Sequence, residues 1–180
     1  TTYRIMGQDV IDLAINELRK LSPESVTEKL PLIGADGYFA LVQQIERIAD
    51  ESGLDSQTVT HLLNRYGSLI SEILDLIKEV PSLGKKLDSD LPYIKAEIYY
   101  AVSHEGARTV DDVISRRTRI AFEARNQGLD LADAIAEIIA PVLGWSTKER
   151  RASVAAYESL VERELAALDE LISESEKVNS

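Results

Sequence analysis

Apolar residues along the 180-residue chain recur mainly at intervals of three to four positions. This spacing places them on one face of an α-helix, whereas a strand with one buried face would alternate apolar and polar residues. No alternating run of useful length is found, and no repeat of roughly 20 to 50 residues is visible. The pattern predicts an all-α fold, a compact bundle of about eight helices with a long C-terminal helix.

Two changes in composition divide the chain into three parts. Residues 1–21 predict a short lead and one helix. Residues 22–36 predict a linker, because they contain two prolines, a glycine and several capping residues. Residues 37–180 predict the main helical domain. The helix of residues 1–21 has a wide apolar stripe, formed by Met6, Val10, Ile11, Leu13, Ala14, Leu18 and Leu21.

Helix boundaries in residues 37–84 follow glycines, prolines and residues that can cap a helix. One helix is expected from about Gly37 to Glu51, with Phe39 and several aliphatic residues on its apolar face. Asp55 and Ser68 are expected to cap the two helices that follow. These two helices invite comparison with a helix-turn-helix, but the second offers three carboxylates and a single lysine, which disfavours DNA binding.

Residues 95–122 combine a helix, a sharp turn and three arginines within four positions. Ile98 belongs to the apolar face of the first helix, which Gly106 is expected to end. Thr109, with Asp112 three residues later, has the form of an N-cap with an acidic partner, so a second helix should begin there. A further helical segment is expected over residues 116–126, ended by Gly128.

The C-terminal part predicts two more helices. The first is expected over residues 129–143, with Pro141 as a late kink and Gly144 as its end. Ser146 and Glu149 have the spacing of a capping box and should open a long last helix, which is a candidate surface for a homodimer or another partner. Its recurring apolar positions are Val154, Tyr157, Val161, Leu165, Leu168 and Leu171 or Ile172.

Charge and composition exclude several functional classes. The chain has 20 basic and 31 acidic residues and a net charge of −11, which disfavours nucleic acid and anionic lipid as partners. It contains no cysteine, so disulfides, thiolate catalysis and cysteine-based metal sites are excluded for these residues. No apolar run approaches the roughly 18 residues that a membrane-spanning helix needs.

The candidate charged residues are Glu97 and Glu105 together with Arg116, Arg117 and Arg119. Eight helical residues separate the two glutamates by about 12 Å. This exceeds the roughly 5 to 9.5 Å that separates paired catalytic carboxylates in glycosidases. Structural ion pairs between the glutamates and the arginines are therefore expected.

The arginines differ in their neighbours along the chain. Arg116 follows Asp112 by four residues and Arg119 precedes Glu123 by four, so each has an acidic partner on the same helix face. Arg117 has no such partner at this spacing.

The two histidines, His61 and His104, do not have the spacing of a metal site, and no metal is expected. The sequence also contains no Gly-x-Gly-x-x-Gly motif and no serine–histidine pair in the context of a nucleophile. No catalytic residue is assigned, and the chain is expected to lack a catalytic centre of its own.

Four segments carry a resemblance to a known family. The segment YAVSHEGARTVDDVISRRTR at 100–119 is the most specific, and it occurs with TTYR at 1–4, HLLNRYGS at 61–68 and LGW at 143–145. Over roughly residues 1–150 the chain resembles the C-terminal part of the FAD-dependent, respiratory glycerol-3-phosphate dehydrogenases. It departs from that pattern at Ser103, where a basic residue is expected, and at Gly106, where a larger one is common.

The resemblance implies a helical cap that follows a flavin-binding body. The whole protein would oxidise sn-glycerol 3-phosphate to dihydroxyacetone phosphate, with hydride passing to FAD and electrons to a quinone. Residues 1–21 would be the tail of that body, with Thr1 and Thr2 near the FAD. The arginine cluster would bind a carboxylate of the body through two parallel hydrogen bonds, and the sequence does not indicate which of the three arginines does so; binding of the substrate phosphate is the alternative role.

The resemblance also implies that this fragment is structural and inactive alone. The full-length protein would be cytoplasmic and peripheral on the cytoplasmic face of the membrane. The alternative is a self-standing acidic helical module for protein interaction. That alternative predicts that the helix of residues 1–21 packs into the domain's own core, whereas the dehydrogenase interpretation leaves its apolar face uncovered.

Overall fold

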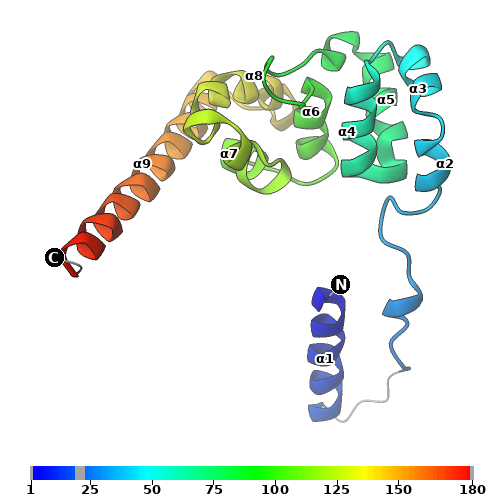
Figure 1. The fold of residues 1–180 in the computed structure, drawn as a ribbon, viewed down its shortest axis with the longest axis horizontal. Helices are drawn as coiled ribbons and strands as arrows, with labels where there is room; N and C mark the ends of the chain where they lie inside the picture. The colour runs from blue at the N-terminus through cyan, green and yellow to red at the C-terminus, as the bar shows by residue number, and fades with distance from the viewer. Residues whose placement is uncertain (1, 19–22, 179–180) are drawn as a thin grey trace.

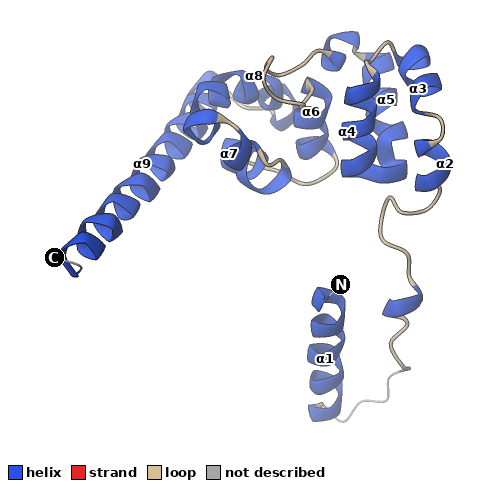
Figure 2. Ribbon diagram, viewed as in Figure 1, coloured by secondary structure: helices blue, strands red, loops and turns tan. Residues whose placement is uncertain are grey.

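The computed structural model describes residues 2–18 and 23–178, with side chains described as far as Leu168. Within these residues the secondary structure is helical, which confirms the all-α prediction (Figures 1 and 2). One isolated antiparallel bridge joins Lys86 and Ile94. The α-helices are α1 (Thr2–Glu17), α2 (Tyr38–Val42), α3 (Ile45–Ser52), α4 (Ser56–Tyr66), α5 (Ile70–Glu79), α6 (Lys95–Ser103), α7 (Ile120–Glu123), α8 (Ala132–Leu143) and α9 (Thr147–Val178).

Shorter helical segments connect these elements. Four of them are 3-10 segments: η1 (Thr27–Lys29), η2 (Gly67–Leu69), η3 (Pro81–Gly84) and η5 (Arg125–Leu131). The segment η4 (Asp112–Arg117) is a π-helix.

The core consists of two hydrophobic clusters that meet at α6. One cluster is built from α6, η4, α7, α8 and the first half of α9. The other is built from α3, α4, α5, η3 and α6. Helix α6 has apolar residues in both clusters, so most of its surface is buried, and Ser103 is its one exposed residue. The polar side chains of α6 must therefore find partners inside the protein.

Helix α1 contributes to neither cluster and has no buried residue. It lies apart from the helical body, with its N-terminal end directed toward that body (Figure 1). Its apolar stripe is exposed, with Val10 at 66%; Leu21 of the predicted stripe lies outside the described residues. Arg4 links the helix to the following segment through hydrogen bonds to the carbonyl oxygens of Thr27 (2.9 Å) and Leu30 (2.6 Å).

The segment after α1 docks on the corner between α4 and α5 through two glycines. Gly34 and Gly67 both have positive φ, and a Cβ on Gly67 would overlap the carbonyl of Gly34. The Ser68 amide donates a hydrogen bond of 2.8 Å to the Gly34 carbonyl oxygen. The prediction that Ser68 caps α5 is wrong, because Ser68 lies inside η2 and the residue at the N-cap position of α5 is Leu69, which has no side-chain oxygen.

The single helix predicted over residues 37–51 is wrong: the chain forms α2 and α3, separated at Gln43 and Gln44. The backbone of Gln44 leaves helical geometry, with φ −117° and ψ 14°. This break lets Ile48 and Ala49 reach the second cluster, while Phe39 on α2 remains 82% exposed. The apolar residues expected on one helix face are thus divided between α2 and α3, which point in different directions.

The helix predicted over residues 116–126 is also wrong. Thr118 is extended and ends the π-helix, α7 has a single turn, and Asn126, Gln127 and Gly128 have left-handed backbone angles. The cause is a close contact at Gly128, where a Cβ would lie 2.6 Å from Cγ2 of the buried Ile120. The helix expected over residues 129–143 begins as α8 at Ala132.

Three helix starts agree with the sequence-based prediction. The Asp55 carboxylate accepts a hydrogen bond of 2.8 Å from the Thr58 amide. Thr109 and Asp112 satisfy one another's backbone amides, and so do Ser146 and Glu149.

Gly144, in left-handed geometry, ends α8 as expected. Beyond it, α9 buries Val154, Tyr157 and Val161, whereas Leu165 and Leu168 are exposed where the helix extends past the body (Figure 1).

Candidate functional site

The most concentrated polar arrangement of the described chain surrounds the fully buried Glu97 on α6. One carboxylate oxygen lies 3.0 Å from Nε2 of His61 and 3.8 Å from Nε of Arg65. The other oxygen accepts a hydrogen bond of 2.9 Å from the Ile94 amide at the start of α6. Every oxygen of this buried carboxylate therefore has a partner, which compensates for the loss of hydration.

The spacing of residues on α4 explains how these partners meet. His61 and Arg65 are four residues apart, so they project from the same face of α4 toward α6. Arg65 also donates to the backbone carbonyl of Arg117 and lies over the rings of Tyr66 and Tyr93, at 5.5 and 5.7 Å from their centroids. We call Glu97, His61, Arg65 and the Arg117 carbonyl the α4–α6 network. It joins the two clusters at the helix they share.

The same motif on α4 makes two further contacts. Asn64 accepts a hydrogen bond of 2.9 Å from the Tyr38 hydroxyl of α2, and Gly67 packs on Gly34. The segment HLLNRYGS thus holds together the preceding segment, α2 and α6. Its residues have structural roles in the described chain.

The ion pair predicted between Glu97 and the arginine cluster is wrong, because helix α4, not η4, faces Glu97. Arg116 instead pairs with Asp111 and, at 3.1 Å, with Asp112, while Arg119 lies 3.5 Å from Glu123. The two pairs expected at four-residue spacing are therefore both present.

Arg117 donates from Nε to the backbone carbonyl of Glu105 at 2.8 Å. Arg117 therefore contacts Glu105, one of its predicted partners, but through the backbone carbonyl and not as an ion pair with the carboxylate.

Glu105 is only partly satisfied by hydrogen bonds. One of its carboxylate oxygens is buried without a hydrogen-bond partner. Burial raises the pKa of Glu105, and the positive charges of Arg65 and Arg117 oppose part of this shift. The side chain therefore retains its proton more readily than an exposed glutamate.

Two tyrosines complete the surroundings as neutral hydrogen-bonding groups. Tyr93 donates to the Glu123 carboxylate and accepts from the Arg119 amide, each at 3.0 Å. Burial raises the pKa of Tyr93 to about 12. Tyr100 donates to Glu72 at 2.6 Å and stacks on His104, whose ring centroid is 4.4 Å away. Neither tyrosine is poised to lose a proton near neutral pH.

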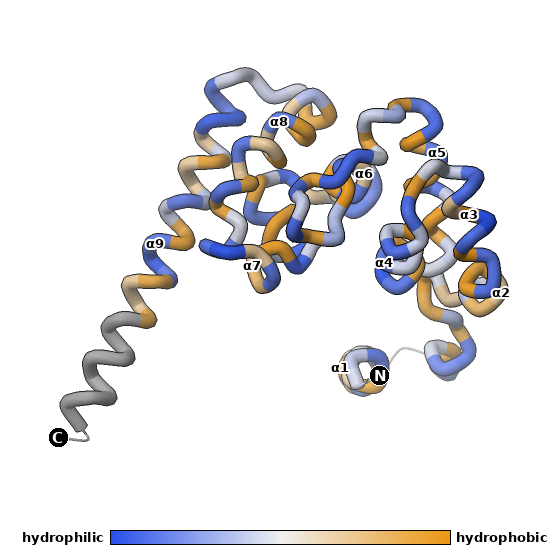
Figure 3. Tube along the Cα trace, turned by 45° about the horizontal axis from the view of Figure 1, so that its top comes forward, coloured by the Kyte–Doolittle hydropathy of each residue, from blue (hydrophilic) through white to orange (hydrophobic). Residues whose placement is uncertain are grey.

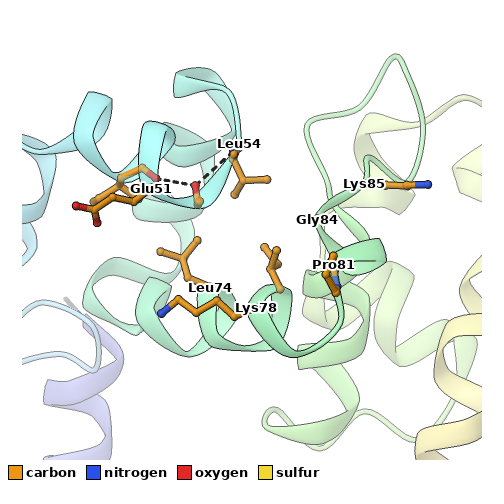
Figure 4. A pocket seen from close by; sticks show the side chains of 11 residues that line it. Glu51, Leu54, Leu74, Lys78, Pro81, Gly84 and Lys85 are labelled. Carbon is orange, nitrogen blue, oxygen red and sulfur yellow. Dashed lines mark hydrogen bonds between the residues drawn. The ribbon is translucent and has the colours of Figure 1, made fainter.

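A separate cavity of about 460 Å³ lies between the end of α3, α5 and η3 (Figure 4). Its walls are mainly aliphatic, and Glu51, Lys78 and Lys85 also line it. Ser52 uses its hydroxyl locally, donating to the Ile48 carbonyl at 2.6 Å. This cavity could not be predicted from the sequence, because tertiary packing brings its separate elements together. Glu51 and Lys78 pair with Arg47 and Asp75, so neither is hydrogen-bonded to Ser52 as a base would be to a nucleophile.

No group of three or more metal-ligating side chains occurs among the described residues. No helix among them is long and apolar enough to cross a membrane. Thr2 is exposed at the start of α1, and Thr1 lies outside the described residues. The chemistry that this arrangement supports is the joining of helices by buried polar contacts.

Comparisons with known proteins give a consistent answer. A family model described as the C-terminal domain of alpha-glycerophosphate oxidase matches residues 25–150. The glycerol-3-phosphate dehydrogenase of Mycobacterium leprae is 42% identical over 165 residues, and glycerol-3-phosphate dehydrogenase 2 of Mycobacterium tuberculosis (strain ATCC 25618 / H37Rv) is 44% identical. Each match covers 92% of this chain and 28% of the relative.

A more distant relative, the glycerol-3-phosphate dehydrogenase of Synechocystis, is 31% identical over 91% of this chain and 29% of its own length. The chain therefore spans less than a third of the length of these relatives. No solved structure matches the chain significantly.

Proposed function

Since this chain belongs to the family of the C-terminal domain of alpha-glycerophosphate oxidase, we propose that it is the helical C-terminal domain of a glycerol-3-phosphate dehydrogenase. The observation that carries the proposal is the match over 92% of the chain to relatives with that name. The whole protein would oxidise sn-glycerol 3-phosphate to dihydroxyacetone phosphate. FAD would accept the hydride, and a quinone would accept the electrons.

This chain would supply structure and not chemistry to that reaction. Its sequence has no Gly-x-Gly-x-x-Gly loop, and Thr1 and Thr2, at the start of the chain, would be the residues that reach the edge of a flavin site. The α4–α6 network would keep the helical domain rigid. Flavin binding, substrate binding and proton transfer would belong to the part of the protein upstream.

The exposed apolar stripe of α1 supports the proposal that this chain supplies structure and the upstream part supplies the chemistry. An isolated 16-residue helix is marginally stable in water, and most helices gain their stability by burying an apolar face. In the proposal, α1 is the last helix of the upstream flavin-binding body and buries its stripe there. The alternative of a self-standing interaction module required this helix to pack into the domain's own core, which it does not.

The experiment compares the full-length protein with the 180-residue chain. The full-length protein should be purified with a visible flavin spectrum that bleaches on anaerobic addition of glycerol 3-phosphate and recovers with a quinone analogue. The 180-residue chain should show neither property. A full-length protein without flavin, or one that glycerol 3-phosphate does not reduce, would refute the proposal.

The proposal includes a peripheral location on the cytoplasmic face of the membrane, where a quinone is accessible. Cell fractionation tests this part independently. The full-length protein should sediment with membranes and be released by high salt or alkaline carbonate. A protein found entirely in the soluble fraction at low salt would contradict it.

A further inference from the structure

Arg119, at the N-cap of α7, and Phe122, within α7, lie outside the two hydrophobic clusters. Phe122 is 78% exposed, and the side chain of Arg119 is 70% exposed. We call these two residues the α7 patch. One exposed apolar residue is ordinary on a protein surface, but arginine and aromatic residues together are the types enriched in protein interfaces and their energetic centres.

The patch is held rigidly from below. Ile120, in the same turn, is fully buried and fills the space that the missing side chain of Gly128 leaves. The backbone amide of Arg119 donates a hydrogen bond of 3.0 Å to the Tyr93 hydroxyl. Because the backbone beneath the patch is fixed on both sides, little ordering would be needed when a partner binds.

Arg119 differs from Arg116 and Arg117 in the number of guanidinium N–H groups that remain available to a partner. Arg116 is engaged by two aspartates, and Arg117 is turned inward to the Glu105 carbonyl. Arg119 has one long contact of 3.5 Å to Glu123 on an exposed surface, where ion pairs are weak. Its guanidinium group can therefore receive a second carboxylate with two parallel hydrogen bonds.

The position of the patch indicates what covers it. Helices α1 and α7 lie on the same side of the helical body in both views (Figures 1 and 3). The N-terminal end of α1 is directed toward that body (Figure 1). Because the matching family model describes a C-terminal domain and this chain spans 28% of its mycobacterial relatives, the upstream part of the proposed full-length protein would join this chain at α1, on this side of the body.

We infer that the upstream part of the same protein packs on the α7 patch, placing an apolar recess over Phe122 and a carboxylate against Arg119. The inference rests on the proposed function for the existence of the upstream part. It selects Arg119, and not Arg117, as the arginine that contacts it. Contact at α7 in addition to the covalent connection through α1 would fix the orientation of the helical domain.

The test uses cysteine labelling of the full-length protein, because this part of the chain has no cysteine of its own. Phe122→Cys is compared with Val80→Cys, an apolar position that is 45% exposed, after replacement of any upstream cysteines. If the upstream part covers α7, a maleimide should label the Phe122→Cys thiol about tenfold more slowly than the control. Equal or faster labelling at position 122 would overturn the inference.

A second substitution tests the arginine with the same readout. Arg119→Glu, added to the Phe122→Cys protein, should accelerate labelling by several fold because it places like charges in contact. The matched control is Arg163→Glu on the exposed surface of α9, which should leave the rate unchanged. An unchanged rate with Arg119→Glu would remove Arg119 from the interface.

These results are distinguishable from failure of the proposed function. A full-length protein that oxidises glycerol 3-phosphate but labels freely at position 122 refutes the α7 interface alone. A protein that lacks that activity yet protects position 122 refutes the proposed reaction and supports the interface.

Discussion

Replacement of Glu97 by alanine should be among the most destabilising single changes in the domain. The substitution leaves His61 and Arg65 partly buried without their acceptor and removes the bond to the Ile94 amide. Breaking a fully buried ion pair costs about 3–5 kcal/mol, and loss of a helix cap costs about 1 kcal/mol. Because His61 and Arg65 retain some exposure, at 18% and 22%, we expect a total of about 3 kcal/mol.

The loss should be measured by urea unfolding of the 180-residue chain at pH 7. In thermal unfolding of a protein of this size, a loss of about 3 kcal/mol in stability corresponds to a decrease in Tm of roughly 6–12 °C. Glu97→Gln retains an acceptor for the Ile94 amide and should lose only about 1–2 kcal/mol. The matched control is Glu137→Ala, which removes an exposed ion pair with Arg150 and should cost under about 0.5 kcal/mol. A loss below about 1 kcal/mol for Glu97→Ala would refute the structural role of the network.

Two further predictions concern the glycine contact and a helix cap. Gly67→Ala should lower the free energy of unfolding by about 2 kcal/mol or more, because its φ is positive and its Cβ would overlap the Gly34 carbonyl. The control Gly53→Ala, with positive φ but open space around the Cβ, should cost about 1 kcal/mol. Equal losses in thermal unfolding would contradict the contact. The Asp55 carboxylate accepts a hydrogen bond from the Thr58 amide, and this bond lowers the pKa of Asp55 despite partial desolvation. The stabilisation that Asp55 contributes is therefore present above its usual pKa of 3.8 and is lost as pH falls through its folded-state pKa. Asp55→Ala should therefore cost about 1 kcal/mol at pH 7 and much less near pH 2; a loss independent of pH in urea titrations would exclude the carboxylate as its source.

The sequence by itself determined the features that depend on residues a few positions apart. The all-α class follows from the spacing of apolar residues, and the starts at Asp55, Thr109 and Ser146 follow from capping chemistry within three residues. The ion pairs of Arg116 with Asp112 and of Arg119 with Glu123 belong to the same class. Local geometry fixes such contacts before the rest of the chain is folded.

Only the tertiary structure decided the contacts between distant parts of the chain. Glu97 faces His61 and Arg65 because the fold brings α4 and α6 within side-chain contact, and no spacing in the sequence encodes that contact. Likewise, the helix expected over residues 116–126 yields to the packing of Ile120 against Gly128, because burying an isoleucine outweighs the helical propensity of a few residues. Partner choice for a buried charge depends on which helix covers it, and that is a property of the whole fold.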